Sequence, residues 1–118
     1  MLSWLRGYRT KASRIPRESL LNEGLHLAMA WGEDWLMPIQ KRLSKNHPNI
    51  SESDLDQINA TCQTAMQFGH STIRNLASTS GGNVKFEDFQ LVVLKHYPWV
   101  NSDNLSGLYS QGIYYARK

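Results

Sequence analysis

The sequence of 118 residues predicts an all-α fold, a compact bundle of four to five helices, from three observations. Apolar residues recur at intervals of three and four along several segments, which is the period of one helix face. Capping residues precede these segments. Prolines and clusters of Gly, Ser and Asn separate them. Because period, caps and turns agree, and because 41% of the residues are apolar, we expect one folded helical domain.

The clearest helix is expected over 51–77. Ser51, followed three residues later by Asp54, is typical of a helix N-terminus, because its hydroxyl can accept a hydrogen bond from the Asp54 backbone. A continuous apolar seam follows over about seven turns. The seam consists of Leu55, Ile58, Cys62, Ala65, Gly69, Ile73 and Leu76. We therefore predict that this helix is the spine of the fold, with neutral polar residues on its other faces.

The other helices are expected to pack against this spine, over 18–45, 86–96 and 103–116. Pro38 lies inside the first of these regions, so it forces a kink or a new helix start there. Either Ser102 or Asp103 is expected to cap the last helix. Two glycines weaken that helix, so it depends on packing for its stability.

A faint internal repeat appears at an offset of 50 residues. Ile39-Gln40, Leu43 and Lys45 recur as Phe89-Gln90, Val93 and Lys95. Pro48, Ile50, Leu55 and Ile58 recur as Pro98, Val100, Leu105 and Leu108. Each copy is a helix, a proline-containing turn and a second helix, which predicts two packed helix hairpins. The alternative is that any two helix hairpins share this much pattern.

Basic residues are concentrated at the N-terminus. Residues 1–17 contain five bases and no acid, a net charge of +5, whereas residues 18–118 contain eight bases and ten acids, a net charge of −2. We therefore divide the chain into a basic amphipathic arm at 1–16 and a single helical domain at 17–118. The predicted anion-binding residues are Arg6, Arg9, Lys11, Arg14 and Arg17.

Several roles fit such an arm. Arginines interleaved with Trp4 and Tyr8 can contact the phosphates of a nucleic acid while the aromatic rings stack on bases. The same residues suit an anionic membrane surface. An acid-free, arginine-rich start is also typical of a mitochondrial presequence. The simplest alternative is a solvated terminus whose Leu2 and Leu5 pack against the bundle.

No catalytic residue, metal site or cofactor is predicted. Glu23 and His26 form Glu-x-x-His, half of a di-iron carboxylate motif, but the nearest second copy begins with Gln67 instead of a glutamate. The alternative is an acid–histidine pair on a solvated helix face. The sequence therefore favours a protein that is not an enzyme. Catalysis would require several of these residues to converge in one buried pocket: Glu23, His26, Glu33, Asp34 and His70.

Residues 82–89 resemble the back half of an EF-hand calcium loop, through Gly82, Val84, Asp88 and Phe89. In that family the front half supplies carboxylate or amide ligands, whereas this chain has Ala77, Thr79 and Gly81. Even with the resemblance, the loop is expected to bind no calcium. The alternative is a glycine-rich turn that enters an amphipathic helix.

Aromatic side chains are the candidates for a partner surface. The predicted partner-binding residues are Trp4, Trp99, Tyr109 and Tyr114. The sequence favours a non-catalytic helical interaction module, a small adaptor or regulatory protein that binds an unknown protein partner or a second copy of itself. The alternative function is binding of a nucleic acid or an anionic surface through the arm.

The expected location is the cytoplasm. Cys62 is the only cysteine, so no intramolecular disulfide can form, which suits a reducing compartment. No apolar run approaches the roughly 18 residues that a membrane helix needs, so no transmembrane segment is predicted.

Overall fold

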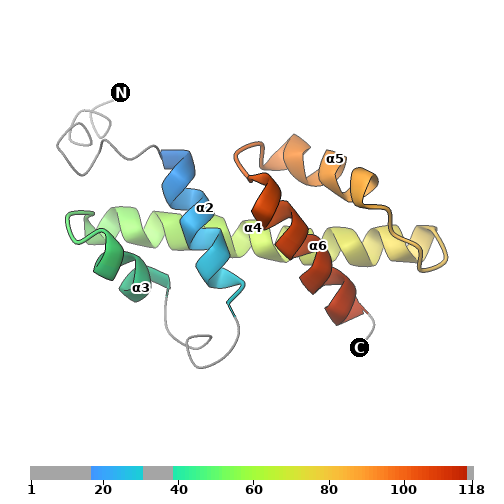
Figure 1. Cartoon of the computed structure of the whole chain (residues 1–118), viewed down its shortest axis with the longest axis horizontal. Coiled ribbons are helices and arrows are strands. Elements are labelled where there is room, and N and C mark those ends of the chain that lie inside the picture. Colours follow the sequence, from blue (N-terminus) through green and yellow to red (C-terminus); the bar gives the residue numbers. More distant parts are fainter. Residues whose placement is uncertain (1–16, 31–38, 117–118) are drawn as a thin grey trace.

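The computed structural model describes residues 17–30 and 39–116, and residues 1–16, 31–38 and 117–118 lie outside this description. About four-fifths of the described residues are helical, and none of them is in a strand. The five described helices are α2 (Arg17–Ala28), α3 (Ile39–Asn46), α4 (Glu52–Thr79), α5 (Phe86–His96) and α6 (Ser102–Ala116) (Figure 1). The prediction of an all-α bundle is confirmed.

The long helix α4 is the spine, as predicted. Its N-cap is Ser51, whose Oγ accepts a hydrogen bond of 3.1 Å from the Asp54 backbone N–H. Six of the seven seam residues are buried, and Leu76 at the far end is half-buried. Thr72 is buried as well, because its hydroxyl donates to the Phe68 carbonyl at 2.8 Å and so needs no solvent.

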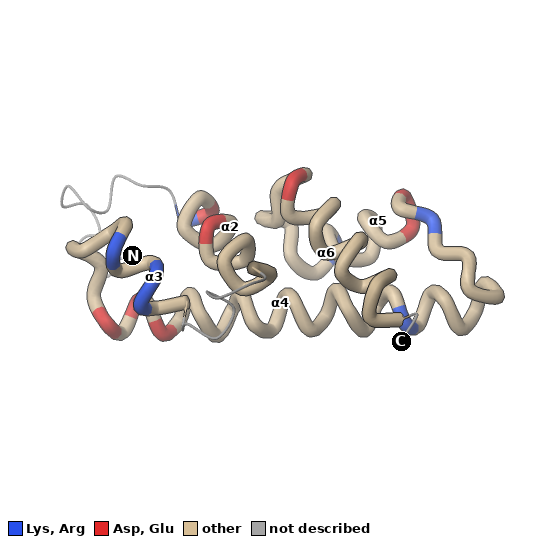
Figure 2. Tube along the Cα trace, turned by 60° about the horizontal axis from the view of Figure 1, so that its bottom comes forward, with Lys and Arg blue, Asp and Glu red and all other residues tan. Residues whose placement is uncertain are grey.

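The other helices all lie on the same side of α4. Helices α2 and α6 cross it side by side, with α3 near its N-terminal end and α5 along its C-terminal half (Figure 1). The molecule measures 50 × 33 × 19 Å, and the shortest dimension fits two layers of helices. The opposite face of α4 is therefore exposed along its length (Figure 2).

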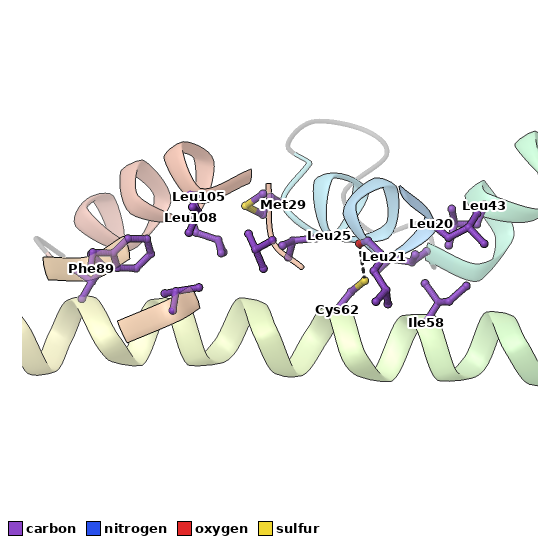
Figure 3. Packing of buried hydrophobic residues seen from close by; sticks show 14 of the residues in the cluster. Leu20, Leu21, Leu25, Met29, Leu43, Ile58, Cys62, Phe89, Leu105 and Leu108 are labelled. Carbon is purple, nitrogen blue, oxygen red and sulfur yellow. Dashed lines mark hydrogen bonds between the residues drawn. The ribbon is translucent and has the colours of Figure 1, made fainter. Parts of the chain in front are cut away.

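The buried side chains form one continuous row between the two layers (Figure 3). Residues from all five described helices contribute to it, and the largest fully buried ones are Phe89, Leu20, Leu25, Leu43, Ile58, Ile73 and Leu108. Cys62 lies within this row and its thiol donates to the Leu21 carbonyl at 3.2 Å. Burial raises the pKa of this thiol to about 12, and the positive charge of Arg17 opposes this with a smaller effect. Cys62 is therefore a packed core residue with little thiolate character.

Two glycines allow the crossing helices to approach α4 closely. A Cβ atom at Gly112 of α6 would lie 2.5 Å from Cγ1 of Ile73. A Cβ atom at Gly24 of α2 would lie 2.8 Å from Sγ of Cys62. Both distances are shorter than van der Waals contact, so each crossing requires the absence of a side chain on the crossing helix.

The two helix hairpins, α3–α4 and α5–α6, share the same turn. In each hairpin, the residue after the first helix donates its N–H to the carbonyl four residues earlier. The residue three positions further on then donates its N–H to the carbonyl of that first donor. These donors are His47 and Ile50 in the first hairpin and Tyr97 and Val100 in the second, with distances of 2.7 to 3.2 Å. The donors of the second hairpin therefore lie 50 residues after those of the first, which is the predicted offset.

The helix cap after each turn is repeated too. The side chain of Asn101 accepts a hydrogen bond of 2.9 Å from the Asn104 N–H, as Ser51 does from Asp54 in the first hairpin. The prediction that Ser102 or Asp103 caps α6 is therefore wrong. All three side chains are suitable caps, and the turn geometry, not the local sequence, places Asn101 at this position.

The hairpins pack through their second helices, α4 and α6. Their first helices, α3 and α5, lie near opposite ends of α4 (Figure 1). The arrangement is therefore a row of helices laid on α4, instead of two hairpins placed face to face along their whole length. Among the described residues, no helix is long and apolar enough to cross a membrane.

Candidate functional site

An elongated groove runs between α2 and α6, on the side away from the outer face of α4. It consists of two adjoining hollows of about 900 and 530 Å³. The hollows share His26, Asp103 and Asn104 in their linings, so they form one continuous depression. We call it the α2–α6 groove.

The wider part of the groove has an apolar floor. Met29 is buried at its base. Gly107 faces the end of the Met29 side chain, and a Cβ atom at Gly107 would lie 3.3 Å from Cε of Met29. Tyr114 lies at the far end with 47% of its surface exposed. The described lining of this part is completed by His26, Ala30, Asp103, Asn104, Ser110 and Gln111. An apolar base with a polar rim suits an amphipathic ligand.

The narrower part is held together by side-chain amides. Asn22 on α2 donates from Nδ2 to the Trp99 carbonyl at 2.7 Å. Its Oδ1 accepts from the Asn101 N–H and from Nδ2 of Asn104, both at 2.9 Å. Asn104 is only 4% exposed, and it donates to Asn101 from its backbone N–H and to Asn22 from its side chain within this network. The network fastens α2 to the start of α6 and fixes the distance between the two walls of the groove.

A second polar chain passes beneath the wider part. His70 on α4 donates from Nε2 to Oε1 of Gln111 at 2.9 Å, and Gln111 donates from Nε2 to the Met29 carbonyl at 3.2 Å. Burial lowers the pKa of His70, the hydrogen bond to Gln111 opposes this, and the positive charge of Arg74 adds to the lowering. Burial therefore favours the neutral form of His70, which donates to Gln111 and so links α4 to both walls.

The charge on the groove is negative. Glu18 lines the narrow part and Asp103 lines both parts, and both side chains are exposed. Glu23 also lines the narrow part, but its carboxylate already accepts hydrogen bonds from Asn46 at 2.8 Å and from His47 at 2.7 Å. No lysine or arginine is among the described lining residues, and the described part of α6 carries no basic residue (Figure 2).

The groove brings together two of the four predicted partner-binding residues. Trp99 lines its narrow end and Tyr114 its wide end. Tyr109 lies elsewhere, half-buried, with its hydroxyl donating to the Val84 carbonyl at 2.7 Å and its ring against Phe86. Trp4 lies outside the described residues. Tyr109 is therefore a structural residue of the α5–α6 contact in this fold.

The predicted anion-binding residues fall mostly outside the description. Arg6, Arg9, Lys11 and Arg14 belong to the undescribed arm. Arg17 is the first residue of α2 and is half-buried. The structure therefore fixes where the arm joins the body, at the α2 wall of the groove beside Glu18.

Of the residues that an enzyme would need, the described ones, Glu23, His26 and His70, are not gathered in one buried pocket. Glu23 is bonded to the turn after α3, His26 is exposed in the groove, and His70 is bonded to Gln111 beneath it. Glu33 and Asp34 lie outside the described residues. In the described part of the chain no three His, Cys, Asp or Glu side chains are placed to hold a metal ion.

Three amide residues of the site had no signal in the sequence. Asn22, Asn104 and Gln111 look like ordinary polar residues of a helix surface, and their role depends on residues about 80 positions away in the chain. Only the helical period, which places Asn104 and Gln111 two turns apart on one face of α6, points toward a shared role.

No family model, curated protein sequence or solved structure matches this chain, so the groove itself provides the argument for function.

Proposed function

We propose that this protein is a non-catalytic helical interaction module that binds a basic amphipathic helix of a protein partner in the α2–α6 groove. The observation that carries the proposal is the groove itself. Its base is apolar, amide side chains bound it, and carboxylates lie on its rim. No lysine or arginine is among its described lining residues. Binding a helix in this groove requires no catalysis, so we expect the protein to act as an adaptor or a regulatory protein.

The shape of the groove favours a helical ligand over a compact small molecule. The α6 wall extends from Asp103 to Tyr114, which corresponds to roughly 16 Å at the rise of a helix, and the preceding turn with Trp99 lies at its narrow end. A helix lying along it would present about three turns of side chains to the base. Helix-in-groove recognition of this kind uses apolar anchors at i, i+3 or i+4 and i+7.

The charge of the groove favours a basic ligand. Glu18 and Asp103 each lie in the first turn of a helix, where the helix dipole favours negative charge. A ligand with lysine or arginine beside its apolar stripe would pair with both. Such rim charges contribute mainly to the rate of association and to specificity.

The test is a binding titration with the full-length chain and a fluorescein-labelled helical peptide of leucine and lysine. The control peptide has glutamate in place of each lysine. We expect fluorescence anisotropy to show binding of the basic peptide only. Equal binding of the acidic peptide, or no binding of either, would contradict the proposal.

Two pairs of variants locate the binding. Asp103→Lys should weaken peptide binding by about fivefold, whereas Asp88→Lys, the matching first-turn aspartate of α5, should leave it unchanged. Tyr114→Ala should weaken it by about tenfold, whereas Leu91→Ala removes a more exposed apolar side chain of α5 without effect. Equal effects within either pair would place the binding outside the groove.

A second candidate function is binding of a nucleic acid or an anionic surface by the arm. The separation of charge favours it, with +5 on residues 1–17 and −2 on the remainder. We expect heparin binding that falls steeply with salt and that is lost when the four arm bases are replaced by glutamine in the full chain. A cytoplasmic location belongs to the same set of proposals, supported by the free, buried thiol of Cys62.

A further inference from the structure

We infer that residues 2–12 of the same chain occupy the α2–α6 groove as an internal ligand while no partner is bound. The inference rests on the proposed function and adds a regulation to it: a partner helix must displace the arm. Three independent features support it, namely the apolar pattern of the arm, the charges of arm and groove, and the position where the arm joins the body.

The apolar pattern of the arm fits the base of the groove. Leu2, Leu5, Tyr8 and Ala12 recur at intervals of three and four, which places them on one face of a helix. A helix of 11 residues cannot be stable by itself in water and needs an apolar surface to cover that face. The base of the groove around Met29 is such a surface.

The charges of arm and groove are complementary. The arm carries Arg6, Arg9, Lys11 and Arg14 and no acid. The groove carries two exposed carboxylates, Glu18 and Asp103, and no lysine or arginine in its described lining. The groove would therefore attract the arm.

The point of attachment places the arm at one end of the groove. Arg17 begins α2, and Glu18 is the first lining residue of the groove. Residues 13–16 are long enough to reverse the chain, and Pro16 ends a preceding helix. A helix over 2–12 is roughly 16 Å long, close to the roughly 18 Å of α2, so it can lie antiparallel along the α2 wall.

A tether of four residues makes this internal ligand effective even with few contacts. Short flexible linkers give effective concentrations on the order of millimolar, so a weak arm would still occupy the groove most of the time. The apparent affinity for an external helix is then reduced by the fraction of molecules whose groove is free. Docking also withdraws the arm's bases from other anions.

The test compares two arm variants of the full-length chain that add the same charge. Leu5→Glu places a carboxylate within the apolar stripe, whereas Thr10→Glu places it on the opposite face of the same helix. We expect Leu5→Glu to shift the backbone NMR resonances of Gly107, Gln111 and Tyr114, and Thr10→Glu to leave them in place. Circular dichroism checks that both variants keep the helical body.

The same variants are then titrated with the leucine–lysine peptide. If the arm fills the groove nine-tenths of the time, Leu5→Glu should bind the peptide about tenfold more tightly than the unmodified chain, with Thr10→Glu unchanged. Equal resonances and equal affinities in all three proteins would overturn the inference while leaving the proposed function intact. Peptide binding by none of them, with groove resonances that still move only in Leu5→Glu, would reject the proposed function and keep the arm in the groove.

A final measurement separates this chain from a second copy. The resonance shifts caused by Leu5→Glu should be the same at low and high protein concentration, because the ligand is tethered. Shifts that grow with concentration, together with a dimer in sedimentation, would overturn the intramolecular assignment.

Discussion

The two helix hairpins use the same turn but are attached to α2 by different chemistry. The first turn is attached through the carboxylate of Glu23, which binds Asn46 and His47 at the edge of the molecule. The second is attached through Asn22, which binds the Trp99 carbonyl and Asn104 in a part-buried amide network. Glu23 and Asn22 both line the narrow part of the groove, but only the second attachment joins α2 to the start of α6, the other wall of the groove.

This difference indicates why the groove is where it is. A carboxylate–histidine contact near solvent depends on charge, so it gives a joint whose strength varies with salt. An amide network is neutral and directional, so it holds α2 and α6 at a fixed spacing. A binding groove needs the second kind of joint, because its walls must keep their separation when no ligand is present.

The largest expected effect concerns the glycines at the two crossings. Gly112→Ala should lower the free energy of unfolding by about 3 kcal/mol, because the new methyl would meet the branched Ile73 at 2.5 Å. Gly24→Ala should cost less, about 2 kcal/mol, since its nearest neighbour is the single Sγ atom of Cys62 at 2.8 Å. Urea denaturation measures both. Gly107→Ala is the control, because Met29 there can move its flexible end.

The amide network should be next in size. Asn104→Ala leaves the half-buried side chain of Asn22 without one of its partners and should cost about 2 kcal/mol. The same substitution should raise the hydrogen exchange rate of the Asn101 N–H, which donates to Asn22. A stability loss below that of a surface alanine substitution would show that the network does not hold the two walls.

The caps test whether the two turns are equivalent. Ser51→Ala and Asn101→Ala each remove the side chain that accepts the N–H three residues later, so each should cost about 1 kcal/mol. Thermal unfolding followed by circular dichroism compares the two variants directly. A much larger cost for one of them would mean that the shared hydrogen-bond pattern hides an unequal dependence on the cap.

The smallest expected effect is a dependence on pH through His70. Its pKa in the folded protein lies below the ordinary value of 6.5, so the unfolded chain binds the proton more readily. The stability it contributes is therefore present above pH 6.5 and is lost as the pH falls toward its folded pKa. His70→Gln should flatten the acid limb of a stability–pH curve, and an unchanged limb would contradict the assignment. The groups around His70 are Gln111, Arg74 and Tyr115.

Much of the fold could be predicted because its signals are local. The seam from Leu55 to Ile73 follows from periodicity within one helix, and the bounds of α5 follow from Phe86 at its start and Pro98 after its end. The cap of α6 was predicted wrongly because Asn101, Ser102 and Asp103 all suit that role locally. Only the turn, closed by Val100, selects the first of them.

The candidate site could be predicted only in part. Aromatic content pointed to Trp99 and Tyr114, which line the groove. The groove itself arises where α2 crosses α4 beside α6, and periodicity within one helix carries no information about such crossings. The pairing of Asn22 with Asn104 is likewise a tertiary contact between two residues that each look solvent-exposed in sequence.

The most direct test of the central claim is a map of where a basic amphipathic helix binds. Backbone NMR resonances of the full-length chain would be followed during titration with the leucine–lysine peptide. The account predicts shifts along both walls of the groove, in particular at His26, Gly107 and Tyr114, and none at Ala60 or Gln67 on the outer face of α4. Shifts confined to that outer face, or to α5, would contradict it.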